Sequence, residues 1–173
     1  MGGLRPARCY RKLERPNTRT SMRKPRKSYV KGVPDPKIHR FESGNRTRKF
    51  TKKMYLAVNN GVQIRNNALE AMRVAANKVL NEAFGTENYF MKILIYPHHV
   101  MRENPLATGA GADRFQTGMR KSFGKPIGLA ARVKPSQNVL LVKYDDVTKE
   151  TAIKRALKLA STKLPSSCKI VAG

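Results

Sequence analysis

The first 53 residues of this chain combine a high positive charge with too few apolar residues to build a core. They contain 18 of the chain's 36 Lys and Arg residues but only three of its 11 acids. Five prolines interrupt the segment, and each prevents a continuous helix. A segment of this composition cannot bury enough apolar surface to fold alone. We therefore expect residues 1–36 to form an arm, largely disordered in isolation, beside one domain that spans residues 37–173.

The arm has the residue types that suit an RNA surface. Arginine side chains bind phosphate groups through paired hydrogen bonds, and aromatic rings stack on exposed bases. We expect nucleic-acid contacts from residues 4–31 in particular. The candidate binding residues in the arm are Arg5, Arg8, Tyr10, Arg11, Lys12, Arg15, Arg19, Arg23, Lys24, Arg26, Lys27 and Lys31.

The net charge of the whole chain, +25, indicates a polyanionic partner, because a free globular protein gains little from so much self-repulsion. A membrane surface is the other polyanion to consider. The sequence has no apolar run long enough for a transmembrane helix and no hydrophobic N-terminal signal segment. Gly2 could begin a myristoylation motif, but Pro6 stands where that motif requires Ser or Thr. A nucleic acid is therefore favoured over a membrane.

Cysteine and histidine residues indicate no metal site. Cys9 and Cys168 lie at opposite ends of the chain without a CxxC pairing, as expected for two idle thiols in a reducing compartment. His98 and His99 are adjacent and His39 is remote, which is not the spacing of zinc ligands. We expect neither a metal nor another cofactor.

Apolar residues at helical spacing predict two amphipathic helices, over residues 66–84 and 147–165. At the start of the first helix, Asn67 is the expected N-cap and Glu70 its capping-box partner. Gly85 is the expected C-terminal stop. The expected buried stripes are Leu69, Met72, Ala76, Val79, Leu80 and Ala83 on the first helix, and Ile153, Ala156, Leu157, Ala160 and Leu164 on the second.

Runs of β-branched and aromatic residues predict strands, and residues 135–137 are a plausible hairpin turn between two of them. The predicted strands cover residues 89–97, 129–133 and 138–144, with shorter candidates at 37–41, 55–58 and 168–171. The most economical arrangement is an α+β fold, in which two helices pack on one face of a small mixed β-sheet. The opposite face or the rim of the sheet is then free for the partner.

A connection of about thirty residues, at about 98–127, joins two of the predicted strands and contains the sequence GAGADRFQTGMRKSFGKP (109–126). A P-loop needs four residues between its glycines and a hydroxyl after the lysine, but five residues separate Gly118 from Gly124, and Pro126 follows Lys125. A dinucleotide-binding loop needs a third glycine where Arg114 stands. Both nucleotide-pocket interpretations are therefore weak. A connection of this length is usually functional, and we expect it to be mobile when unbound.

The acidic residues do not suggest a catalytic centre. A nuclease would need clustered carboxylates to hold divalent metals, and the acids here are few and scattered. The adjacent pair Asp145 and Asp146 precedes a predicted helix, where capping and the helix dipole explain it. No nucleophile lies in a strand–turn–helix elbow. We therefore expect the protein not to be an enzyme.

Four strings carry a family resemblance: RPARCYR (5–11), GVPDPKI (32–38), GAGADRFQTGMR (109–120) and FGKPIGLAARV (123–133). They closely resemble the archaeal and eukaryotic large-subunit ribosomal protein L-ten-e family, whose bacterial counterpart is L-sixteen. The likeness runs in order over essentially the whole chain. A chain that ends at residue 173, without the longer C-terminal extension of eukaryotic members, resembles an archaeal form.

The resemblance implies a hammerhead-like sheet and a monomer within the large ribosomal subunit of the cytoplasm. Its partners would be large-subunit rRNA beside the aminoacyl-tRNA site and the peptidyl-transferase centre, 5S rRNA nearby, and neighbouring ribosomal proteins. In this family the loop that matches 102–112 reaches toward the tRNA acceptor ends. The implied tRNA-proximal residues are Arg102, Glu103, Asn104, Thr108, Gly109, Gly111 and Arg114, and the implied rRNA contacts beyond them are Arg120, Lys121 and Lys125.

Composition leaves two other functions open. A free RNA chaperone or a chromatin-type nucleic-acid-binding protein would have the same charge, but it would be stripped from ribosomal subunits by high salt. A nucleotide-dependent enzyme would bind a mononucleotide saturably as the isolated protein.

Overall fold

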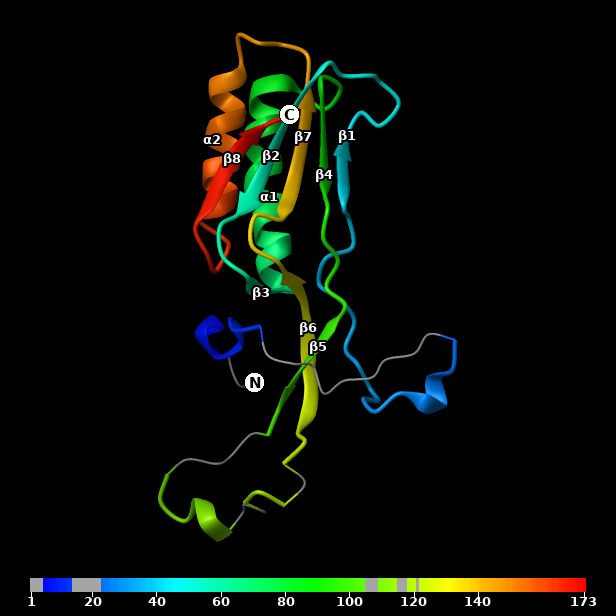
Figure 1. The fold of residues 1–173 in the computed structure, drawn as a ribbon, viewed down its shortest axis with the longest axis vertical. Coiled ribbons are helices and arrows are strands. Elements are labelled where there is room, and N and C mark those ends of the chain that lie inside the picture. Colours follow the sequence, from blue (N-terminus) through cyan, green and yellow to red (C-terminus); the bar gives the residue numbers. More distant parts are fainter. Residues whose placement is uncertain (1–4, 14–22, 105–108, 115–117, 121) are drawn as a thin grey trace.

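The computed structural model describes residues 5–13, 23–104, 109–114, 118–120 and 122–173 (Figure 1). The strands are β1 (Glu42–Gly44), β2 (Lys52–Val58), β3 (Val62–Arg65), β4 (Tyr89–Ile93), β5 (His99–Glu103), β6 (Lys125–Val133), β7 (Asn138–Tyr144) and β8 (Cys168–Ala172). The helices are α1 (Asn66–Phe84) and α2 (Glu150–Ser161), with short 3-10 helices η1 (Ala7–Tyr10), η2 (Pro25–Lys27) and η3 (Ala112–Arg114). None of the helices in these ranges is long and apolar enough to cross a membrane.

The strands form two sheets. One has five strands in the order β1-β4-β7-β2-β8, and the other has three in the order β3-β6-β5. Within each sheet, every pair of neighbouring strands is antiparallel. The predicted α+β class with two helices is therefore confirmed, whereas the single mixed sheet is wrong in detail, because the strands divide into two sheets and pair only in the antiparallel sense.

The division into two sheets arises at the connection between β6 and β7, which was expected to be a hairpin turn. The two strands instead follow one another in the same direction, one in each sheet (Figure 1). Ser136 has a positive φ of 58°, and its N–H donates to the Val58 carbonyl at 2.7 Å. The Val58 N–H in turn donates to the Gln137 carbonyl at 3.1 Å. The connection thus pairs with the end of β2 and carries the chain from one sheet into the other.

Both α-helices lie on the same face of the five-stranded sheet and pack against each other (Figure 1). Alternate strand residues such as Leu56, Met91, Leu140 and Val142 are completely buried under the helices. Each buried side chain of this size contributes roughly 1.5–3 kcal/mol relative to exposure. The two predicted helix stripes are confirmed, since their members are either buried in this core or packed against it. The core therefore lies between the helices and the sheet, and the sheet's other face is open.

The start of α1 differs from the predicted capping box. The helix begins at Asn66, directly after β3, so that Arg65 occupies the cap position with an extended backbone and no side-chain capping bond. Glu70 pairs with Arg73 at 2.6 Å instead of closing a box with Asn67. The reason is that the strand runs into the helix without a turn. An arginine at the cap position has only donors and cannot accept a bond from the first helical N–H groups.

The other helix ends are closer to expectation. Gly85 ends α1 with a φ of 69°, and its N–H donates to the Asn81 carbonyl at 3.0 Å, as predicted for a C-terminal stop. The second helix, α2, is shorter than predicted, because residues 147–149 and 162–165 form turns and bends outside it. Leu164 lies beyond the helix but still packs against the core.

Candidate nucleic-acid interface

The three-stranded sheet projects from the body of the protein, and the arm and the long loop gather around it (Figure 1). β5 and β6 form the two legs of this projection, with η3 in the loop beyond them and η1 beside β3. The described cations among the predicted contacts are exposed on these segments: Arg5, Arg8, Arg11, Lys12, Arg23, Lys24, Arg26, Lys27, Lys31, Arg114, Arg120 and Lys125. Most of the predicted positive surface thus lies on one projecting part of the molecule, away from the main core.

The first part of the arm is held to the domain by its backbone. Gln63 of β3 donates from its main-chain N–H to the Arg11 carbonyl at 2.9 Å and from its side chain to the Tyr10 carbonyl at 3.1 Å. Arg65 donates from Nη1 to the Arg5 carbonyl at 2.8 Å. Because these bonds use main-chain atoms of the arm, the side chains of Arg8 and Arg11 remain exposed to a partner. The sequence did not predict that residues 5–13 have partners within the chain.

Glu103, at the base of the long loop, joins the loop to the arm. Its carboxylate forms an ion pair with Arg5 and accepts a hydrogen bond from the Tyr10 hydroxyl at 3.0 Å. Burial, together with the bond to Glu103, raises the pKa of Tyr10 to about 12. Since this folded-state pKa exceeds the ordinary value of 10.0, the stabilisation is complete below about pH 10 and is lost as the pH rises toward 12. Two predicted rRNA contacts, Arg5 and Tyr10, therefore meet at Glu103, a predicted tRNA-proximal residue.

We expect Glu103→Gln to loosen the arm, because glutamine keeps the shape but loses the ion pair with Arg5 and weakens the bond to Tyr10. A charge-assisted hydrogen bond contributes about 1.5–3 kcal/mol, and solvent around the half-exposed Arg5 reduces this to roughly 1 kcal/mol. The amide of Gln63, which donates to the arm, should then exchange its hydrogen about fivefold faster by NMR. Glu87→Gln, in an exposed bond with Asn45, is the matched control. Equal exchange rates in the two variants would show that Glu103 does not hold the arm.

The stem of the long loop is closed by a stack between Arg102 and Phe123. The guanidinium carbon lies 3.7 Å from the centre of the ring, and Nη1 donates to the Phe123 carbonyl at 2.7 Å. The next residue, Gly124, has a φ of 76°, and a Cβ there would lie 2.6 Å from the Glu103 carbonyl oxygen. Only glycine fits this close approach of the two legs. Arg102 is therefore engaged by its own chain as well as being a predicted tRNA-proximal residue.

The loop beyond the stem uses its glycines as expected, for backbone conformations that other residues rarely adopt. Gly109, Gly111 and Gly118 have φ values of 124°, 74° and 55°. A Cβ at any of them would meet no atom of the described residues within 4 Å. Arg114 ends the short helix η3 and is exposed, whereas Asn104 is half-buried beside the stem. The predicted contacts Arg15, Arg19, Thr108 and Lys121 lie outside the described residues.

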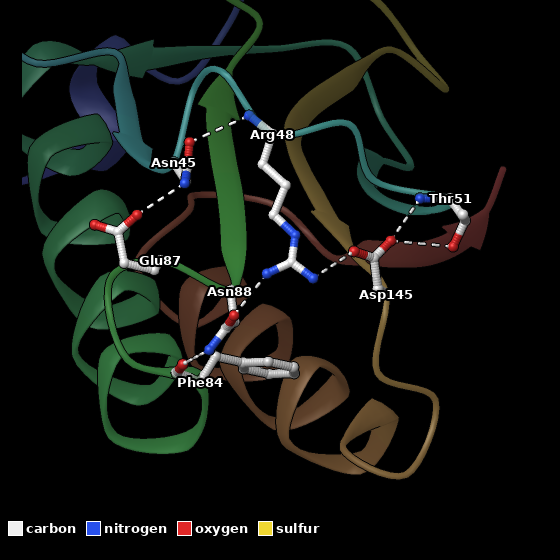
Figure 2. Close-up of polar contacts among 7 residues, drawn as sticks. All are labelled: Asn45, Arg48, Thr51, Phe84, Glu87, Asn88 and Asp145. Atoms are coloured by element: carbon white, nitrogen blue, oxygen red, sulfur yellow. Dashed lines mark hydrogen bonds and ion pairs between the residues drawn. The ribbon is translucent and has the colours of Figure 1, made fainter.

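A second basic region, between β1 and β2, was not singled out from the sequence. Figure 2 shows how polar contacts fix this turn: Asn45 accepts from the Arg48 N–H at 3.2 Å and donates to Glu87 at 2.8 Å. Arg48 donates to Asn88 at 2.7 Å and pairs with Asp145 at 3.2 Å. The turn thereby presents Arg46 and other cations on its exposed side.

The same network accounts for Asp145 without catalysis. The carboxylate accepts from both the N–H and the hydroxyl of Thr51, at 2.8 and 3.2 Å, and these bonds together with Arg48 lower its pKa (Figure 2). Its neighbour Asp146 accepts from the N–H and hydroxyl of Thr148, at 3.0 and 2.7 Å. The two carboxylates therefore serve different turns. Among the residues that the structure describes, no three His, Cys, Asp or Glu side chains lie together as a metal site would require.

The open face of the five-stranded sheet is also basic. Lys53, Lys143 and Phe90 are cross-strand partners on this face, and the Lys143 ammonium lies 5.6 Å from the centre of the Phe90 ring. The alternation of residues along β2 and β7 would have predicted this face, because period-2 alternation separates its side chains from the buried ones. The sequence-based expectation that one face of the sheet is left free is consistent with this arrangement.

Comparison with known proteins agrees with the resemblance drawn from the sequence motifs. A protein-family model described as ribosomal protein L16p/L10e matches residues 17–171. The large ribosomal subunit protein uL16 of Archaeoglobus fulgidus is 46% identical over 167 residues, which cover 96% of this chain and 91% of that protein. The protein of the same name from Staphylothermus marinus is 49% identical over 168 residues, covering 97% and 92%. That of Methanococcus maripaludis is 44% identical over 168 residues, covering 97% and 93%.

The family model includes the arm from residue 17 onward, the body and the long loop, and each of these relatives matches 96–97% of the chain. They confirm the resemblance to the archaeal and eukaryotic form of the family. The matched span contains both helices and all but the last residue of the last strand. The chain therefore belongs to the ribosomal protein L16p/L10e family and is a structural constituent of the ribosome, not an enzyme.

Proposed function

We propose that this protein binds large-subunit rRNA through its arm, its projecting sheet and its long loop, and so helps to organise the aminoacyl-tRNA site beside the peptidyl-transferase centre. The observation that supports this most directly is that the exposed predicted cations lie on the projecting segments, while the main apolar core lies elsewhere. As a ribosomal protein, the chain works in the cytoplasmic ribosome. Its proposed neighbours are 5S rRNA and other ribosomal proteins, with one copy in each subunit.

The proposed binding is positional rather than catalytic. Each Lys or Arg that meets a phosphate displaces condensed counterions, which makes the affinity depend steeply on salt. Folded RNA is recognised mainly by shape, by its phosphates and by its 2′-hydroxyls, which suits an irregular basic surface. In this proposal residues 1–36 form the rRNA-binding arm and residues 37–173 form the domain that places it.

The long loop has a proposed second partner, the acceptor ends of tRNA, through residues 102–112. The closed stem of Arg102 and Phe123 supports this assignment, because it gives the loop a fixed base from which to project. The positive-φ glycines of the loop would permit a close approach of its backbone to RNA.

Crosslinking of the assembled large subunit tests the main proposal. We expect residues 1–31 and 98–126 to crosslink to large-subunit rRNA, and the protein to sediment with large subunits in high-salt gradients. A chain that is stripped from the subunit by moderate salt and crosslinks to many unrelated RNAs would favour the free RNA chaperone or chromatin-type protein instead.

The tRNA assignment predicts the effect of deleting residues 105–111. This deletion keeps Glu103, which contacts the arm, and the Arg102–Phe123 stack, so the domain and its rRNA docking should be unchanged. Binding of tRNA to the aminoacyl site of isolated subunits should fall severalfold, or late subunit maturation should slow. Ribosomes with the 105–111 deletion that translate at the normal rate would remove the tRNA assignment.

A further inference from the structure

A cavity of about 380 Å³ lies where the docked arm, the end of β3, the start of α1 and the two legs of the projecting sheet meet. This volume is within the range of small-molecule sites, roughly 300–1,000 Å³. Apolar side chains, among them Met101 and Ile127, line the cavity together with polar and charged groups. The cavity is distinct from the glycine-rich loop in which the sequence first suggested a nucleotide pocket.

The positive end of α1 opens on this cavity. The first four N–H groups of any α-helix lack partners within the helix, and they attract anions. In α1 no side chain caps them, because the cap position is held by Arg65. The first two helical residues, Asn66 and Asn67, both line the cavity. The helix therefore presents uncapped donors to the space instead of to a side chain of its own chain.

A buried side chain without a partner points independently to a ligand. Asn66 is only 6% exposed and lines the cavity, yet its side-chain amide has no hydrogen bond to any residue that the structure describes. Buried polar side chains in proteins are almost always hydrogen-bonded. The Nε of Arg65 is also buried without a partner. Among the described residues, the Asn66 amide and the Arg65 Nε thus have no hydrogen-bond partner, although Nη1 of the same arginine donates to the Arg5 carbonyl.

The charges around the cavity favour an anion. Arg5, Lys37 and Arg65 contribute three cations, and Asp35 and Glu103 two acids. Of the acids, Glu103 is already paired with Arg5 and bonded to Tyr10. The positive end of the helix adds to the excess of positive charge.

From this arrangement we propose that the cavity binds one phosphate group at the start of α1, through the uncapped N–H groups and the amide of Asn66, with the apolar lining residues available to an attached nucleoside. The expected source of this phosphate is an rRNA nucleotide that enters the cavity, and in this respect the inference rests on the proposed function. A free mononucleotide has the same chemistry and is the other source to test.

The decisive variant is Asn66→Asp, which preserves the shape of the side chain and places a negative charge where phosphate would bind. At the N-terminus of a helix this charge is favourable, so the variant should fold with equal or higher thermal stability. Asn67→Asp applies the same test from the neighbouring residue. Asn81→Asp is the matched control, because it makes the same charge change on an exposed residue about 22 Å along the same helix.

The first experiment titrates inorganic phosphate, and separately AMP, into the isolated full-length chain and follows the amide signals by NMR. We expect saturable shifts at residues 66–69 and the side-chain amide of Asn66, which Asn66→Asp and Asn67→Asp abolish and Asn81→Asp retains. Non-specific association with a chain of net charge +25 would instead move signals over the whole surface without saturating.

The second experiment measures binding to large-subunit rRNA against salt. The slope compared is that of the logarithm of the binding constant against the logarithm of the salt concentration. Loss of one phosphate contact should make this slope about 0.7–0.9 less steep in Asn66→Asp than in Asn81→Asp. Saturable phosphate binding with equal slopes would overturn rRNA as the source in favour of a free phosphate or nucleotide. A reduced slope without binding of free phosphate would support rRNA alone. Equal slopes with no saturable shifts would overturn the cavity as a site. If the wild-type chain failed to bind rRNA, the proposed function would fail, while the first experiment would still decide the cavity.

Discussion

Leu157→Ala should lower the free energy of unfolding by about 2–5 kcal/mol, the largest effect of any single change considered for this protein. Leu157 is 0% exposed on the inner side of α2, within the cluster that joins both helices to the five-stranded sheet. Truncation removes buried apolar surface and leaves a cavity that close-packed neighbours cannot fill. Urea denaturation followed by circular dichroism would measure the change.

The same helix offers a matched control two residues away. Leu159 is 40% exposed, so Leu159→Ala makes the same chemical change without a buried cavity. Its effect should stay within about 0.5 kcal/mol, as for most surface substitutions. Comparable losses in the two variants would mean that α2 does not pack on the sheet through the side that contains Leu157.

Replacing Arg8, Arg11 and Arg15 together with alanine should make rRNA binding markedly less sensitive to salt. If each of the three arginines meets one phosphate, the slope of the logarithm of the binding constant against the logarithm of the salt concentration becomes less steep by about 2–3. Over a fourfold rise in salt the wild type should then lose roughly 16- to 64-fold more affinity than the variant. Arg8 and Arg11 are exposed although the arm's backbone is bonded to Gln63, so their removal should leave the docking of the arm intact. Incorporation into large subunits should weaken in parallel.

The comparison for this triple variant removes three other exposed cations, Arg155, Lys158 and Lys163, on and just after α2. Both variants lower the net charge equally, so a difference between them reports on location and not on total charge. An unchanged slope in the arm variant would refute the role assigned to the arm. Equal reductions in both variants would show that the binding follows net charge alone.

The sequence was sufficient to predict those helices and strands whose apolar residues repeat over a long continuous segment. Nineteen residues of α1 repeat their apolar positions over several turns, so the helix and its buried side could be predicted from spacing. β3 could not, because its four residues, VQIR, are too few to show a period and run directly into the helix. The division into two sheets depends on Ser136 and Val58, which are far apart in the chain. Such a contact leaves no trace in a local pattern.

The candidate interface shows the same limit. Charge counts alone indicated the arm and the loop, since exposure follows from an excess of cations with few acids. The joining of Arg5 and Tyr10 to Glu103 brings together residues more than 90 positions apart in the chain, and sequence spacing cannot predict it. The cavity at the start of α1 was missed because Asn67 was interpreted as the N-cap of the helix.

The two legs of the projecting sheet, β5 and β6, set how far from the body the long loop is held. β6 has nine residues, which at about 3.4 Å per residue give a rod of roughly 30 Å. Each leg continues into the five-stranded sheet, through β4 on one side and β7 on the other. The loop is therefore attached to the body through two main-chain connections, one at each of its ends. Because the pairing of β5 with β6 fixes the position of the loop's two ends, the loop can vary in sequence without moving its base.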